Sequence, residues 1–185
     1  MSRLVSTVVL GLILLGCQRG KEQAVVIVPS DLQIDANSIP ADPFGTSNPA
    51  YTRLREVTDG ALANQWSGSL DDFAPWLEAE TVAVERALGL LKALRVGPRD
   101  VYAVGNGRIA MLYEHIATTM RRASEAAESV GSSPDWKDEE TRVYEQAQSF
   151  WARCARDSGA EGTHLDAWNL RCQAGLASRL AQPEP

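Results

Sequence analysis

The sequence predicts an all-α protein, an antiparallel bundle of about five helices that follows a disordered Pro-rich tether. Apolar side chains recur at helical spacing over several long stretches, and the clearest series runs from Ile109 to Val130 at intervals of three and four residues. Short connections that contain Gly or Pro separate these stretches. We expect at most one short strand, so helices packed on helices are the fold class that the pattern favours.

The first sixteen residues have the order of an export signal. Arg3 precedes an uncharged, mainly apolar run from Leu4 to Leu15, which is shorter than the roughly 20 apolar residues of a membrane-spanning helix. The run ends in Leu14-Leu15-Gly16-Cys17, which resembles the lipobox of bacterial lipoproteins, although Leu15 stands where that class usually has a smaller residue. The resemblance implies a signal peptide over residues 1–16 and a diacylglyceryl group on Cys17. An ordinary secretory signal is the alternative.

The same resemblance implies a location. Two or more acyl chains anchor a protein stably to a membrane, so we expect the protein in the bacterial cell envelope, with its domain facing the periplasm or the cell surface. Gln18 rather than Asp follows the cysteine. In enterobacterial-type sorting, this residue favours the outer membrane.

Residues 17–49 are expected to form the lipid anchor and a flexible tether. Prolines punctuate this region among Gly, Asp, Asn and Ser residues. A flexible coil of about 30 residues spans roughly 30 Å on average. The β-branched run Ala24–Val28 stands apart from this pattern. It would form an edge strand, an extended arm on the domain or an apolar segment near the membrane.

The helical bundle is expected over residues 50–182. A first, weak helix runs from Pro49 to about Gln65. A second begins after the candidate caps Ser69 and Asp72, and the dipeptide Gly97-Pro98 ends it.

The third helix carries one ambiguity. The run from Val101 to Gly107 could be a strand entering an Asn-Gly hairpin turn. The helical periodicity favours instead one long helix from about Arg99 to Ser129, with a possible irregularity near Gly107. Gly105 lies on the same face as Ile109, where a missing side chain would let a neighbouring helix approach closely.

Two further helices complete the predicted bundle. Ser133 and Pro134 provide a cap and a first-turn proline for the fourth helix, and Gly159 is its expected end. Thr163 and Asp166 form a capping-box-like pattern at the start of the fifth.

Three cysteines are an odd number for an exported protein. If Cys17 carries lipid, Cys154 and Cys172 remain as an even pair in an oxidising compartment, and we expect a disulfide between them. The bond would stabilise the fold by roughly 3 kcal/mol. It requires the fourth helix to end near Arg153 or a staggered crossing of the two helices. Two buried thiols are the alternative.

The charge of the chain narrows the classes of partner. The formal net charge is −6, and loss of Arg3 with the signal makes the mature protein more acidic. Nucleic acids and anionic lipid surfaces both require a basic face, so we expect neither electrostatic partner.

No catalytic constellation emerges from the residues. Glu114 and His115 are adjacent and would point in different directions on a helix, and His164 lies beside a predicted helix start, where exposure is usual. The chain has no HExxH, GxSxG or P-loop motif. We therefore expect no catalytic residue, no metal site and no cofactor. A pair of His164 with Cys154 as nucleophile is conceivable, but a disulfide is the more natural use of that cysteine.

The five tryptophans are expected mainly in the core, although they could line a ligand groove. They are Trp66, Trp76, Trp136, Trp151 and Trp168. Because Trp136 lies so close to a helix start, it is the one expected to be partly exposed and to contact a partner.

The C-terminal region resembles the last hairpin of the lysozyme-inhibitor-like lipoprotein domain over less than a quarter of the chain. The residues that carry the resemblance are the run Gln146–Trp151, Arg153, Cys154, Cys172, Leu176 and Arg179. The first cysteine lies closer to the tryptophan than in that family, so no binding residue is transferred.

We therefore expect a lipid-anchored envelope protein with a non-catalytic binding or structural role, and with an envelope protein as its partner. One alternative is an inhibitor of a secreted hydrolase, which needs an exposed rigid edge around the Cys154–Cys172 hairpin. The other is an envelope enzyme, which needs a cleft where His115 or His164 meets carboxylates from another helix.

Overall fold

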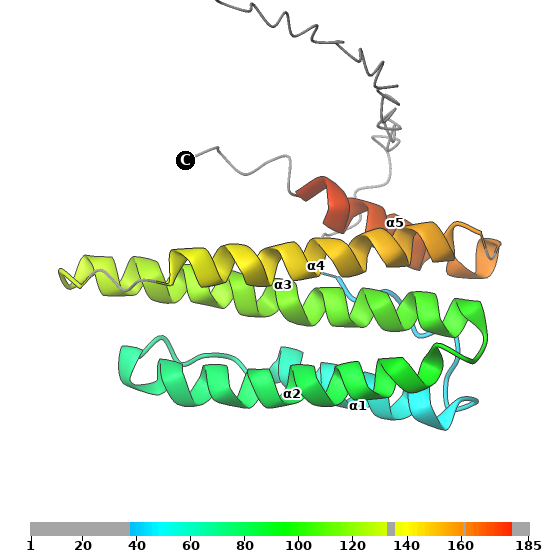
Figure 1. The fold of residues 1–185 in the computed structure, drawn as a ribbon, viewed down its shortest axis with the longest axis horizontal. Coiled ribbons are helices and arrows are strands. Elements are labelled where there is room, and N and C mark those ends of the chain that lie inside the picture. The colour runs from blue at the N-terminus through cyan, green and yellow to red at the C-terminus, as the bar shows by residue number, and fades with distance from the viewer. Residues whose placement is uncertain (1–37, 133–135, 161, 179–185) are drawn as a thin grey trace, which may run out of the picture.

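The protein is described by a computed structural model over residues 38–132, 136–160 and 162–178. This part of the chain is all-α. Its helices are α1 (Pro49–Ala63), α2 (Phe73–Leu94), α3 (Arg99–Ser129), α4 (Lys137–Ser158) and α5 (Asp166–Ala177), with 3-10 turns at Leu70–Asp72 and Thr163–Leu165. Successive helices run antiparallel, and α3 lies between the α1–α2 pair and α4, with α5 packed on α4 (Figure 1). The predicted all-α bundle of five helices is confirmed.

Local sequence explains the start of α1 better than that of α2. The Asn48 side chain accepts a hydrogen bond from the Tyr51 backbone N–H at 3.1 Å, and Pro49 occupies the first helical position, where its missing N–H costs nothing. Asp72 occupies the N-cap position of α2 without a capping side-chain hydrogen bond. Its carboxylate accepts instead from the Ser67 hydroxyl at 2.9 Å.

Helix α3 continues without a break through Gly105-Asn106-Gly107, so the hairpin reading and the expected irregularity are both wrong. A Cβ on Gly105 would lie 2.9 Å from a methyl group of Leu91, and a Cβ on Gly107 would lie 2.9 Å from the sulfur of Cys154. The two glycines thus let neighbouring helices approach α3 closely on opposite sides. The predicted close approach at Gly105 is confirmed, and α3 can lie in the middle of the bundle because of it.

The ends of α4 and α5 differ from the prediction in detail. Helix α4 begins at Lys137, and its predicted cap and proline at 133–134 lie outside the described residues. It ends at Ser158, directly before Gly159 as expected. Helix α5 begins at Asp166 after a 3-10 turn rather than immediately after Thr163.

The predicted disulfide between Cys154 and Cys172 is present, with the two Cα atoms 5.8 Å apart and both residues fully buried. Because α4 continues four residues beyond Cys154, an early end of this helix near Arg153 is wrong, and the staggered crossing is what brings the sulfurs together.

Residues 38–48 pack on the bundle, although the sequence assigns them to the flexible tether. The Trp168 indole N–H donates to the Ala41 carbonyl at 3.1 Å, Arg55 forms an ion pair with Asp42, and Phe44 meets the Tyr51 ring edge-on at 5.1 Å. The folded domain therefore begins before the predicted boundary. Cys17 and Ala24–Val28 lie outside the described residues.

Within the residues that the structure describes, no helix combines the length and the apolar character needed to cross a membrane.

Candidate functional site

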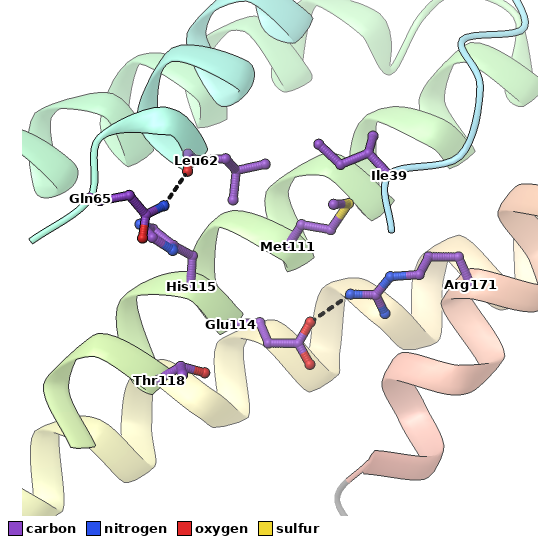
Figure 2. Close-up of a pocket in the computed structure, with 8 residues that line it drawn as sticks. All are labelled: Ile39, Leu62, Gln65, Met111, Glu114, His115, Thr118 and Arg171. Carbon is purple, nitrogen blue, oxygen red and sulfur yellow. Dashed lines mark hydrogen bonds and ion pairs between the residues drawn. The ribbon is translucent and has the colours of Figure 1, made fainter. Parts of the chain in front are cut away.

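A groove of about 410 Å³ opens on one face of α3, between the end of α1 and the middle of α5 (Figure 2). Four of its lining residues come from α3 and follow the spacing i, i+3, i+4 and i+7, which places them on one helix face. They are Met111, Glu114, His115 and Thr118. Leu62 and Gln65 border the groove from the α1 side, Ile39 from the N-terminal segment and Arg171 from α5.

Arg171 is the most unusual side chain of the groove because it is a buried cation, with only 3% of its side chain exposed. Its Nη2 donates to the Glu114 carboxylate at 2.8 Å, and its guanidinium lies 4.3 Å from the centre of the Trp151 ring. Its Nε and Nη1 atoms are buried and have no hydrogen-bond partner in the described part of the chain. A guanidinium carries five N–H donors, so one carboxylate leaves most of its capacity unused.

His115 lies half-buried at the other end of the groove. Burial lowers the pKa of His115 below 6.5, the nearby charge of Arg122 lowers it further, and a hydrogen bond to the Asn64 backbone opposes both. The imidazole is therefore neutral at pH 7. Its Nε2 atom is buried and has no partner among the described residues.

A polar cluster continues behind His115. The Trp76 ring, which meets His115 edge-on at 5.7 Å, donates its indole N–H to the Asn64 carbonyl at 2.8 Å. The Asn64 side-chain amide donates to one oxygen of Glu80 at 2.8 Å, and the other oxygen of this buried carboxyl has no partner within the described residues. Burial raises the pKa of Glu80, against the opposing effect of the Asn64 hydrogen bond.

The other candidate residues lie outside the groove. Trp136 is partly buried and packs on Phe73 with ring centres 4.6 Å apart, whereas the other four tryptophans are buried in the core as expected. His164 lies 3.4 Å from the Asp100 carboxylate with half of its side chain exposed. A nucleophile pair of His164 with Cys154 is excluded by the disulfide. The lipid-attachment prediction for Cys17 concerns residues that the structure does not describe.

Arg171 was not among the residues predicted from the sequence, and Glu114 and His115 were expected to point in different directions. Adjacent residues point about 100° apart on a helix, but the uncovered face of α3 is wide enough that both border the groove. A signal was available in the polar residues at 114, 115 and 118 beside the apolar series of α3, and in an arginine directly preceding a buried cysteine.

Among the residues described, no group of three or more His, Cys, Asp or Glu side chains could hold a metal ion.

Comparisons with protein-family models, with curated proteins and with solved structures find no match to this chain. The groove and the N-terminal sequence are therefore the features that bear on function.

Proposed function

We propose that this protein is a lipid-anchored component of the bacterial cell envelope whose helical bundle binds a ligand without transforming it. The observation that carries the binding role is Arg171, a buried cation in the groove with two nitrogen atoms that have no partner among the residues the structure describes. Burying a charged donor without a partner is costly. A concave site with a few converging polar groups is where such a cost is recovered by a ligand.

The arrangement of the groove supports binding rather than catalysis. The Glu114 carboxylate is bound to Arg171, and the His115 imidazole contacts the Trp76 ring and the Asn64 backbone. Acid–base and nucleophilic catalysis usually require a reactive group within hydrogen-bond reach of a base that a third group orients. The partners of Glu114 and His115 instead hold each side chain in place.

The location is proposed from the sequence Leu14-Leu15-Gly16-Cys17. In cells that express Cys17→Ala, the protein should be lost from the membrane fraction, while Cys154→Ala should remain there. A Cys17→Ala protein that stays firmly membrane-bound and unprocessed would contradict the lipid anchor. That the partner is a protein of the cell envelope is a separate prediction, which co-purification from intact envelopes would test.

Native mass spectrometry of protein purified from envelopes tests the binding role. Thr118 is exposed at the border of the groove, so Thr118→Trp should fill it. Val82 on α2 is 59% exposed outside the groove, so Val82→Trp is the matched control. We expect an additional bound mass on the wild type and on Val82→Trp that is absent from Thr118→Trp. The same mass on all three proteins, or on none, would contradict a ligand in the groove.

A further inference from the structure

We infer that the groove takes a small organic carboxylate with a short apolar body, whose carboxylate joins Arg171. This inference rests on the proposed binding function and adds the chemical class of the ligand. It follows from the charge at the groove, the geometry of Arg171 and the apolar surface between Arg171 and His115.

The charge at the groove disfavours a ligand with two negative charges. Arg171 and Glu114 are the cation and the anion among the lining residues, so their charges balance. Arg122 lies outside this lining, although its charge lowers the pKa of His115. A monocarboxylate adds one negative charge next to Glu114, whereas a phosphate dianion adds two and is repelled more strongly.

The setting of Arg171 suits a carboxylate. Its guanidinium is fixed by the Trp151 ring at 4.3 Å and by the Glu114 carboxylate at 2.8 Å. Planar N–H donors in a fixed fork bind carboxylates with good geometry. Nε and Nη1 have no partner among the described residues, so the guanidinium keeps N–H donors for a second carboxylate.

The surface between the two polar ends is apolar. Figure 2 shows Met111 between His115 and Arg171, with the side chains of Leu62 and Ile39 facing the same space. Ligand pockets usually measure about 300–1,000 Å³, so a groove of about 410 Å³ fits a small molecule. At the far end, the unpaired Nε2 of neutral His115 can accept a hydrogen bond from a hydroxyl or amide of the ligand.

The test uses hexanoate as the probe and isothermal titration calorimetry on the full lipidated protein in nanodiscs, with empty nanodiscs as the blank. Hexan-1-ol keeps the apolar body without the charge, and inorganic phosphate supplies an anion without the body. We expect saturable binding of hexanoate. Hexan-1-ol should bind at least about tenfold more weakly than hexanoate, because hydrogen bonds between charged groups are stronger than those of a neutral hydroxyl. Equal affinity for hexan-1-ol, tighter binding of phosphate or no binding of hexanoate would each overturn the inference.

The matched variants are Arg171→Met and Arg142→Met. Arg142 lies on α4 with 69% of its side chain exposed, so the same chemical change there should leave hexanoate affinity unaltered. Arg171→Met should weaken it about tenfold or more, and unaltered affinity would overturn the inference. If Arg171→Met does not fold by circular dichroism, Thr118→Trp takes its place, and hexanoate should not bind to it.

An independent readout is the imidazole NMR signal of His115. Hexanoate with its carboxylate on Arg171 extends its apolar end past Met111 toward His115, so saturating hexanoate should shift this signal in the wild type and in Arg142→Met. An unchanged signal would overturn the inference. If hexanoate fails while native mass spectrometry still shows a mass that Thr118→Trp removes, the carboxylate class is wrong and the binding function stands.

Discussion

The two sides of α3 are built in different ways. Both sides include a close contact at a glycine, since a Cβ on Gly105 would meet Leu91 of α2, but the tightest contacts lie toward α4 and α5. A Cβ on Gly107 would collide with Cys154 and Trp168, and a Cβ on Gly175 would overlap the indole of Trp151. The disulfide lies in the same layer.

Toward α1 and α2, the contact includes buried titratable groups. Glu80, Asn64 and His115 form the polar cluster behind the groove, and each of the two ionisable groups has a pKa moved toward its neutral form by burial.

One bundle thus contains two kinds of sensitivity. The α4–α5 side should respond to changes of volume and covalent linkage, because tightly packed interiors cannot accommodate added atoms. The α1–α2 side should respond to pH, because buried ionisable groups link proton binding to stability.

Reduction of the disulfide should have the largest effect. Cys154 and Cys172 are 18 residues apart, and closing a loop of this size stabilises a fold by about 3 kcal/mol. Urea unfolding with and without a reductant measures the difference. The double variant Cys154→Ala/Cys172→Ala should be insensitive to reductant, and free thiols at both positions of the untreated wild type would contradict the bond.

Gly175→Ala should destabilise the protein by about 1–3 kcal/mol, because the new methyl group forces the fully buried Trp151 to move. Gly60→Ala on α1 is the control, since a Cβ there meets nothing within 4 Å. Replacing a helical glycine in open space should stabilise by about 0.4–1 kcal/mol. Chemical unfolding of both variants checks the opposite signs, and equal effects would contradict the close contact at Gly175.

Glu80→Gln should remove a loss of stability at high pH. The pKa of Glu80 is raised above its usual 4.5, so the folded state keeps the proton of this carboxyl group to a higher pH than the unfolded state does. This term favours folding at low pH and is lost as the pH rises from 4.5 through the folded pKa. Urea unfolding across this range measures the free energy of unfolding of both proteins. The wild-type value minus the variant value should fall as the pH rises. Glu85→Gln makes the same change at an exposed position of α2.

His115→Gln should remove a pH dependence of the opposite sign. The pKa of His115 is lowered below 6.5, so the unfolded state binds the proton more readily. The wild type should therefore lose stability, relative to the variant, as the pH falls below 6.5 toward the folded pKa. Urea unfolding at several pH values measures the free energy of unfolding of both proteins. If the difference between the wild type and the variant does not change in this interval, His115 is not buried as described.

The helix positions could be predicted because they depend on local residue spacing, and the disulfide could be predicted from the number of cysteines. The spacing from Ile109 to Val130 predicts the helix, and setting Cys17 aside leaves one possible pair. The role of residues 38–48 could not be predicted, since the hydrogen bond from Trp168 to Ala41 joins positions 127 residues apart. The lipid anchor remains a prediction, because it concerns residues outside the described part of the chain.

Periodicity and residue counts along the chain establish a helical bundle with a cysteine pair, and the order of residues near the N-terminus predicts an export signal and a tether. The position of the groove depends instead on how the helices pack. The face of α3 with Glu114 and His115 remains open because α1 and α5 meet α3 on either side of it, and Arg171 reaches that face from 57 residues away. Helix periodicity shows which residues share a face, but the packing of other helices decides which face is left uncovered.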